Sequence, residues 1–465
     1  MLFSSVTFLY YFLPAVLLIY FLVPKSFKNV VLLLSSLIFY AWGGIFYALL
    51  MVLAIAMGYG FGLLIERFRG RWQSKFFMIL SVAGVISFML YFKYTDFFLE
   101  NFNRLTGAAI PLLKITLPIG ISFYTFQIIS YLIDVYRGET AQRNPISLAA
   151  YVSMFPQLIA GPIVRYTDIA RELDTRTHSF DEAALGARRF ILGLGKKIFI
   201  ANILYGLCET FRASNERTVL FYWLYAVSNA LYIYFDFSGY SDMAIGLGRI
   251  FGFHFLENFN YPFISKSATE FWRRWHMSLG SWFRDYVYIP MGGNRVPKLR
   301  WMFNILVVWF LTGFWHGAAW NFIIWGLFFA VLLMVEKLWL GKYLEKSRVL
   351  SRVYLLAAVI ISFIIFSASD MRQAFADLGG LVGAGGIPFA GAESLYYLKS
   401  YGIVLLLGIV GSTPIVKKGF VCLAERAKTR GVVAVLEPVV LLGMMMVMTG
   451  YLVNGSFNPF LYFRF

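Results

Sequence analysis

An ionisable side chain in the middle of an apolar stretch is costly, so it marks a candidate functional site. His316 stands in such a stretch, in the sequence LTGFWHGAAW at residues 311–320. A neutral imidazole can take a proton from a hydroxyl group near pH 7. Gly313 and Gly317 flank the ring and predict room for a substrate beside it. His316 is therefore a candidate general base; the alternative is a structural histidine bonded to a backbone carbonyl.

A second histidine, His276, lies among aromatic and basic residues in the sequence FWRRWHMS at 271–278. Here Arg273 and Arg274 could pair with phosphate groups while the tryptophans stack on a planar group. The alternative is a membrane-surface helix, with tryptophan at the headgroup level and arginine on lipid phosphate. The separation from His316 does not fit metal ligands, but the two rings could meet in space as a polar pair.

Two carboxylates, Asp236 and Asp242, occur in an otherwise apolar segment. Their spacing does not place them on one face of a helix, which argues against an acid–base pair. They could orient a histidine or bind a substrate hydroxyl, or else cap a broken helix or bind an arginine. Of the other histidines, His178 is expected in a solvated loop, and His254 at an interface or in the core.

Other catalytic motifs are missing from the sequence. It contains no G-x-S-x-G elbow, no P-loop and no H-E-x-x-H motif. Its two cysteines, Cys208 and Cys422, form no C-x-x-C pair. We therefore expect no bound cofactor and no metal site.

The composition indicates which kind of protein must position these residues. Of the 465 residues, 60% are hydrophobic and 14% are charged, and the formal net charge is +17; the mean hydropathy is +0.70. A soluble domain has about 25% charged residues, and a soluble nucleic-acid binder would not be so apolar. We therefore expect a multi-pass membrane protein that binds no nucleic acid. Its excess positive charge would face the cytoplasm and anionic lipid, or hold a polyanionic donor.

Helices are the only plausible spanning elements, because lipid tolerates no exposed unpaired backbone. Apolar runs predict about 10 to 12 spans of roughly 20 residues each. The candidate spans are 7–24, 29–41, 45–64, 76–93, 115–136, 186–207, 219–250, 301–315, 318–335, 353–368, 401–416 and 432–453. The simplest organisation is a single domain over residues 1–465, in an all-α fold.

Charge asymmetry predicts the orientation. The segments 337–352 and 417–430 are strongly basic, whereas 369–400 is nearly charge-balanced, so the basic segments are expected in the cytoplasm. In the central third, the stretch 147–165 is interrupted by prolines and glycine, and 268–290 has the apolar spacing of an amphipathic helix. Broken backbone at membrane depth is tolerated where it packs in protein or lines a wet cavity. We therefore expect re-entrant or interfacial helices around a polar cavity.

Six motifs occur in order along the chain, and together they are specific. They are FPQLIAGPIVRY at 155–166, FDFSGYSDMA at 235–244, NFNYPF at 258–263, FWRRWH at 271–276, YIPMGGN at 288–294 and WHG at 315–317. The series resembles the membrane-bound O-acyltransferases (MBOAT), and within them the bacterial branch that acts in alginate O-acetylation.

The resemblance implies a ring of transmembrane helices around a central funnel, in the bacterial cytoplasmic (inner) membrane. It implies that His316 is the catalytic histidine and His276 its second histidine. Acetyl-CoA, or another acyl thioester, is the implied donor, and the acetyl group would pass through an extracytoplasmic acetyltransferase to a polysaccharide such as alginate. Substrate contacts are expected from Trp315, Asn260, Arg273, Arg274 and Asp236, with Asn260 or an amide near Gly317 as an oxyanion donor.

Three other functions stay open at this point. The same fold would suit D-alanyl transfer to teichoic acid from a carrier-protein thioester, or acetyl transfer to peptidoglycan. A protein of a different class, a transporter for a lipid-linked sugar, would also use broken helices and intramembrane carboxylates. Such a transporter would show no dependence on a thioester.

Overall fold

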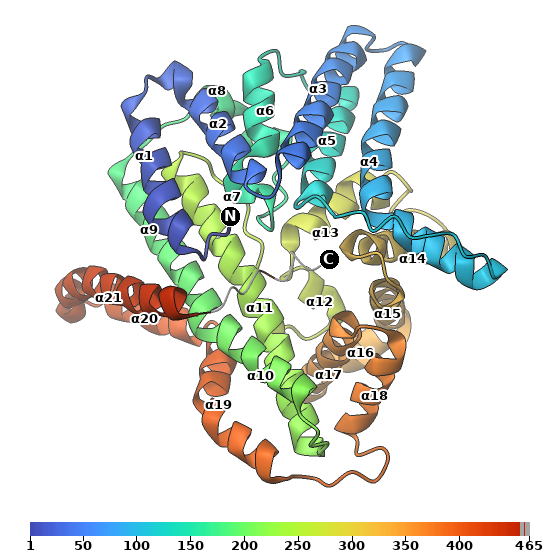
Figure 1. Cartoon of the computed structure of the whole chain (residues 1–465), viewed down its shortest axis with the longest axis vertical. Coiled ribbons are helices and arrows are strands. Elements are labelled where there is room, and N and C mark those ends of the chain that lie inside the picture. The colour runs from blue at the N-terminus through green and yellow to red at the C-terminus, as the bar shows by residue number, and fades with distance from the viewer. Residues whose placement is uncertain (456–459, 461–465) are drawn as a thin grey trace. The chain divides into compact units, whose positions relative to one another are not determined.

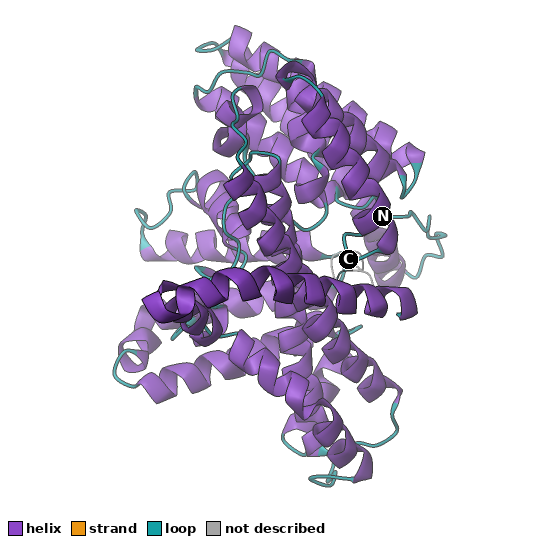
Figure 2. Cartoon of the chain, turned by 90° about the vertical axis from the view of Figure 1, so that its left-hand side faces the viewer, coloured by secondary structure: helices purple, strands orange, loops and turns teal. Residues whose placement is uncertain are grey.

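The computed structural model describes residues 1–455 and 460, with backbone only for 427–430. Over this part of the chain the regular elements are helices, and Figure 2 shows helices joined by loops without a strand. The one β-type pairing is an isolated bridge between Phe259 and Trp275. The predicted all-α class is thus confirmed.

The described chain forms two compact units. The first comprises Met1–Phe190 and Met243–Leu256, and the second comprises Ile191–Asp242 and Glu257–Phe465. Helices of the first unit are η1 (Phe8–Phe12), α1 (Leu13–Leu22), η2 (Lys25–Phe27), α2 (Lys28–Ala41), α3 (Ile45–Arg67), α4 (Trp72–Thr106), α5 (Ile121–Arg137), α6 (Pro145–Ser153), α7 (Phe155–Leu158) and α8 (Tyr166–Asp174). Two long helices, α9 (Phe180–Gly195) and α11 (Val219–Ile250), contribute residues to both units.

The second unit contains both candidate catalytic histidines. Its helices are η3 (Lys196–Ala201), α10 (Asn202–Ala213), η4 (Pro262–Ile264), α12 (Ala268–Trp272), α13 (Met277–Phe283), η5 (Arg284–Tyr288), α14 (Lys298–His316), α15 (Trp320–Val335), η6 (Glu336–Leu340), α16 (Gly341–Leu344), α17 (Arg348–Ser367), α18 (Met371–Leu381), α19 (Ala392–Gly411), α20 (Ile415–Glu425) and α21 (Ala427–Asn454). Figure 1 labels the α-helices of this unit. The single-domain organisation stays a prediction.

Each of the twelve predicted spans coincides wholly or partly with a helix. Seven helices in the described chain are long and apolar enough to cross a membrane: Ile45–Arg67, Trp72–Thr106, Phe180–Ala213, Trp320–Leu344, Arg348–Ser367, Ala392–Gly411 and Gly431–Asn454. Helices α2 and α5 have 14 and 17 residues, fewer than the roughly 20 that a full span needs. A multi-pass membrane fold follows, while the central funnel stays a prediction.

The amphipathic stretch 268–290 is not the continuous helix that its spacing predicts. It divides into α12, α13 and the π-helical η5, and His276 at the break has φ +45°. Helix α12 begins where Ser267 accepts a hydrogen bond from Glu270 N. The buried Glu336 carboxylate accepts further bonds from the amides of Ala268 and Thr269, which suits the positive end of a helix. These caps fix where the broken segment starts.

Helices α14 and α15 form a tight hairpin that ends α14 at His316. A Cβ atom at Gly313 would lie 2.4 Å from the Phe322 carbonyl oxygen, and one at Gly317 would lie 2.2 Å from the Phe322 ring. The two glycines therefore allow α15 to pack closely against α14. The predicted room for a substrate at these positions is wrong, because the neighbouring helix fills it.

Candidate active site

His316 is enclosed by aromatic rings at the end of α14. Its side chain is buried, and its ring lies 4.9 Å from the Trp325 ring and 5.6 Å from the Phe366 ring. Gly317 follows in an extended conformation and ends the helix. An imidazole in such apolar surroundings is costly to charge, which favours the neutral ring that a general base requires.

His276 occupies the break between α12 and α13 in a left-handed backbone conformation. This conformation costs a non-glycine residue of order 1–2 kcal/mol, so strong local contacts must hold it. Nδ1 of His276 lies 3.1 Å from Asn258 Oδ1, and the two side chains are buried. The imidazole also stands edge-on to the Phe237 ring, with a centroid distance of 4.6 Å. Strain of this kind is found at functional sites.

The contacts of Asn258 determine which nitrogen of His276 carries the proton. Asn258 Oδ1 accepts hydrogen bonds from the backbone N–H of Ser278 at 3.3 Å and from its hydroxyl at 2.9 Å. An oxygen that accepts from a backbone N–H must be the carbonyl oxygen of the amide. Nδ1 of His276 therefore donates, and the lone pair of the neutral ring is on Nε2. Burial also lowers the pKa of His276, which favours this neutral form.

The structure brings His276, His316 and Trp315 together. The Trp315 ring lies 5.0 Å from the His316 ring and 6.2 Å from the His276 ring. All three side chains are buried. Two histidines forty residues apart in sequence thus share one aromatic neighbour, and direct pairing of their rings stays a prediction.

We expect the Asn258→Ala variant to lose both stability and activity. It leaves the buried donors of Ser278 and His276 without their acceptor, at a cost of about 1–3 kcal/mol, and it removes the bond that sets the His276 tautomer. The thermal unfolding midpoint and the acyl-transfer rate, measured on purified protein, should both fall. Asn258→Asp keeps an acceptor oxygen in place and should recover much of the loss. Equal behaviour of wild type and Asn258→Ala would contradict the assigned role.

A pocket of about 850 Å³ is lined by residues that neighbour the two histidines in the sequence, although neither histidine lines it. Its wall includes Met277, the residue after His276, and Thr312, one helical turn before His316. The rest of the wall includes five aromatic residues and several aliphatic ones, and its basic residues are Arg273, Arg284 and Lys337. Such a pocket suits an elongated ligand with an apolar arm and an anionic end.

Asn260 and Arg274 line a different pocket, of about 750 Å³. Arg274 donates from Nη1 to the Asn260 carbonyl oxygen at 3.2 Å and forms an ion pair with Glu270 at 2.9 Å. The substrate-binding residues predicted from the sequence are thus divided: Arg273 lines the pocket beside the histidines, and Asn260 and Arg274 line the second one. Their roles toward substrate stay predictions.

Asp236 is held in a buried ion pair. Its Oδ1 lies 2.5 Å from Nζ of Lys197, and the two side chains are 1% and 0% exposed. One residue earlier, Lys196 pairs with Asp242 at 2.6 Å, with both side chains partly exposed. Of the alternatives weighed for these carboxylates, the structure shows ion pairing, with lysine in place of arginine. The sequence pattern did not single out Lys197 as the partner.

The remaining histidines have their own contacts in the first unit. His178 lies in a loop, as predicted, but it is half-buried and bonds to the Tyr20 hydroxyl at 2.9 Å. His254 is exposed, and its Nδ1 lies 2.7 Å from the Glu172 carboxylate. Among the described residues, no three His, Cys, Asp or Glu side chains gather as metal ligands would.

Comparisons with known proteins are consistent with this geometry. Residues 87–372 match the model of the membrane-bound O-acyltransferase family, a range that includes both histidines. A probable alginate O-acetylase of Azotobacter vinelandii is 43% identical over 382 residues, which cover 81% of this chain and 77% of that protein. A peptidoglycan O-acetyltransferase of Helicobacter pylori is 34% identical, with 83% of this chain and 81% of that protein covered.

A more distant relative covers less of the chain. The teichoic acid D-alanyltransferase of Bacillus subtilis is 33% identical over 280 residues, which are 55% of this chain and 70% of that protein. Family membership favours an enzyme over the transporter that the broken helices had left open. The chain belongs to the membrane-bound O-acyltransferase family, and it is a multi-pass membrane enzyme that transfers acyl groups to hydroxyl oxygens.

Proposed function

We propose that this enzyme takes an acetyl group from acetyl-CoA at the cytoplasmic face and delivers it for O-acetylation of an extracytoplasmic polysaccharide such as alginate. The observation that carries the proposal is the buried pair of His276 and His316 around Trp315. Five probable alginate O-acetylases are 40–43% identical to the chain. The membrane in question would be the bacterial inner membrane.

His316 would act as the general base. As the acceptor hydroxyl oxygen attacks the thioester carbonyl carbon, the imidazole takes the hydroxyl proton. When the carbon–sulfur bond breaks, the imidazolium returns that proton to the leaving thiolate, so a free thiol and an acetyl ester result. General-base help is typically worth about 10²- to 10⁴-fold in rate. His276, with its lone pair on Nε2, would complete the polar environment of the reacting groups.

The pocket beside the histidine pair supports a thioester donor. Its aliphatic and aromatic side chains suit the pantetheine arm of the donor, and Arg273, Arg284 and Lys337 suit its phosphates. Lys337 belongs to the basic segment 337–352, which charge asymmetry assigns to the cytoplasm. A base reached from that side avoids moving a charged donor across about 30 Å of hydrocarbon.

The acceptor would be a hydroxyl group outside the cytoplasm, with a separate extracytoplasmic acetyltransferase carrying the acetyl group to the polymer. Peptidoglycan is a second candidate acceptor. The match to the peptidoglycan O-acetyltransferase of Helicobacter pylori favours it, because that match also covers most of the chain. These two acceptors share the donor and the chemistry at His316.

Donor identity is the direct test of this proposal. Membranes containing the enzyme are supplied with acetyl-CoA labelled in the acetyl group, or with a carrier protein that holds labelled D-alanine as a thioester. We expect label in ester linkage on extracellular polymer from acetyl-CoA alone. Transfer from the D-alanyl thioester and none from acetyl-CoA would contradict the proposal.

A further inference from the structure

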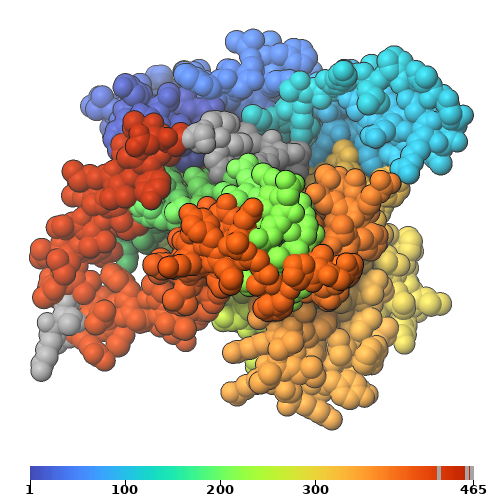
Figure 3. Space-filling model, turned by 60° about the horizontal axis from the view of Figure 1, so that its bottom comes forward, coloured from blue at the N-terminus to red at the C-terminus, as the bar shows by residue number. Residues whose placement is uncertain are grey.

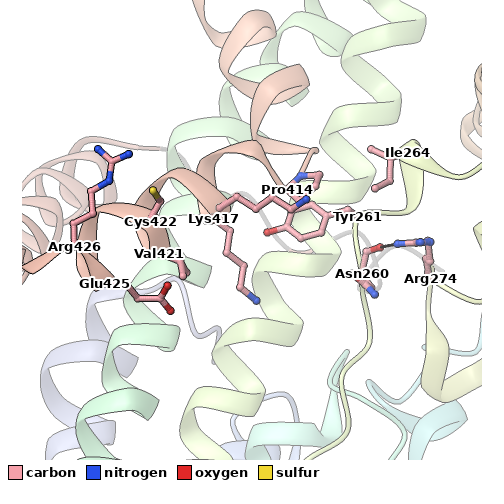
Figure 4. A pocket seen from close by; sticks show the side chains of 11 residues that line it. Asn260, Tyr261, Ile264, Arg274, Pro414, Lys417, Val421, Cys422, Glu425 and Arg426 are labelled. Carbon is pink, nitrogen blue, oxygen red and sulfur yellow. Dashed lines mark hydrogen bonds between the residues drawn. The ribbon is translucent and has the colours of Figure 1, made fainter. Parts of the chain in front are cut away.

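The second pocket, of about 750 Å³, lies between helix α20 and the loop that holds Asn260 (Figure 4). One wall is formed by Pro414, by one face of α20 and by Arg426, which follows that helix. The residues on that face of α20 recur at intervals of three and four: Lys417, Lys418, Val421, Cys422 and Glu425. The other wall includes Asn260, Tyr261 and Arg274. Figure 4 shows Asn260 and Arg274 on one side and Val421, Cys422 and Glu425 on the other, with the Tyr261 ring drawn next to Pro414.

The charge of this pocket is positive. Its basic residues are Arg274, Lys417, Lys418 and Arg426, and its one carboxylate is that of Glu425. Arg274 is already engaged by the Glu270 carboxylate and the Asn260 carbonyl, so the excess positive charge comes largely from Lys417, Lys418 and Arg426. Lys417 and Lys418 lie in the first turn of that helix, which begins at Ile415 after Pro414. The unsatisfied amides of a helix N-terminus add positive partial charge at the same place. Lysine ammonium groups beside a helix N-terminus suit an anion such as phosphate.

Helix α20 also has the character of a helix that lies in the membrane surface. Its apolar residues Ile415, Val416 and Leu423 are 65%, 58% and 47% exposed. Lys417 and Lys418, by contrast, line the pocket. It follows α19, a candidate span, and precedes a second candidate span in α21. Figure 3 shows the C-terminal helices, coloured orange to red, at the surface of the molecule. An amphipathic helix of this kind places its basic residues at the level of lipid headgroups.

We infer that this pocket binds a phosphate-bearing anion, and that the anion is the headgroup of an acidic phospholipid. Lys417 and Lys418 would contact the phosphate oxygens, and the polar side chains of Asn260 and Tyr261 would face the headgroup from the opposite wall. The segment 417–430 is one of the basic segments expected in the cytoplasm, where the anionic lipids of the cytoplasmic leaflet attract lysine and arginine side chains. Soluble phosphates share this chemistry, and the experiment distinguishes the two sources.

The two cysteines of the chain make a direct assay possible. Cys422 is exposed and lines the pocket, whereas Cys208 is buried, so a maleimide should react with Cys422 in the folded protein. The labelling rate is measured in nanodiscs of phosphatidylcholine alone and in nanodiscs that contain phosphatidylglycerol. We expect phosphatidylglycerol to slow the labelling of Cys422 by at least about fivefold. A site is rarely empty when the concentration of its ligand is well above the Kd.

Matched variants separate a site from general surface charge. Lys417→Gln combined with Lys418→Gln should abolish the protection, whereas Lys342→Gln combined with Lys346→Gln removes the same charge elsewhere and should leave it intact. Labelling of Cys208 before denaturation would reveal a misfolded variant. In that case Lys417→Arg combined with Lys418→Arg, which retains both charges, is tested instead and should keep the protection. Equal protection in both glutamine variants would overturn the inference.

A further arm of the experiment tests the source of the phosphate. Adenosine 3′,5′-bisphosphate and inorganic phosphate are added to protein in phosphatidylcholine alone. Protection by phosphatidylglycerol and not by the soluble compounds supports the lipid; protection by the soluble compounds alone overturns it. Because the readout is thiol labelling, the result does not depend on acyl transfer or on the proposed donor.

Discussion

The His316→Ala variant is expected to transfer acyl groups about 10²- to 10⁴-fold more slowly than wild type. Alanine removes the imidazole that would accept the hydroxyl proton, while the Trp325 and Phe366 rings around it remain. The initial rate of ester formation, measured on membranes that contain equal amounts of enzyme, gives the factor directly.

His254→Ala is the matched control for that variant. His254 is an exposed histidine whose ring contacts Glu172, so its replacement should leave the transfer rate within about twofold, as expected of a surface substitution. An active His316→Ala enzyme, or an equal loss in both variants, would contradict a special role for His316.

The second large effect concerns the buried pair of Lys197 and Asp236. Asp236→Asn should destabilise the protein by about 3–5 kcal/mol, because it leaves the ammonium group of Lys197 buried without its counter-ion. Chemical or thermal unfolding in detergent, followed by tryptophan fluorescence, measures this change. We expect a strongly lowered unfolding midpoint and less folded enzyme in the membrane.

The neighbouring pair supplies the control. Lys196 and Asp242 make the same kind of contact but are 31% and 19% exposed, so Asp242→Asn should cost only about 0–1 kcal/mol. Replacing both buried partners, by Lys197→Met with Asp236→Leu, should restore stability, since a buried pair can often be exchanged for apolar residues. If Asp236→Asn were as stable as Asp242→Asn, the buried pair would not be a determinant of the fold.

Hydropathy predicted the helices well where an apolar run is long. The predicted 219–250 coincides with α11, and 45–64 falls within α3. Hydropathy did not predict the ends of helices where a local turn of the backbone ends the helix. The predicted 401–416 extends past the end of α19 at Gly411, because the turn at 412–414 carries apolar neighbours on both sides.

The break at His276 shows a second limit of periodicity. The apolar residues of 268–290 keep helical spacing through the break, so their pattern alone predicts one helix. The contacts that interrupt it come from residues 258–260, including the bridge between Phe259 and Trp275 and the bond from Met277 N to the Asn258 carbonyl. Such long-range pairing overrides a local preference.

For the candidate site, the residue types indicated which side chains matter, but the sequence did not predict which side chains contact one another. An ionisable ring in apolar surroundings singled out His316, and the structure confirms that it is buried. Nothing in the spacing could show that Asn258 holds His276, or that Lys197 pairs with Asp236, because these contacts depend on how helices pack. The glycines beside His316 misled for the same reason: a small residue leaves space for a substrate or for another helix alike.

The central claim is that one histidine pair joins a cytoplasmic donor to an acceptor on the other side of the membrane. Sealed inside-out vesicles expose the cytoplasmic face, so acetyl-CoA with a labelled acetyl group is added outside, and the polymer and its acetyltransferase are enclosed in the lumen. We predict labelled ester in the lumen with the wild-type enzyme and almost none with His316→Ala. Equal luminal label with both enzymes, or label confined to the outer face, would contradict the account.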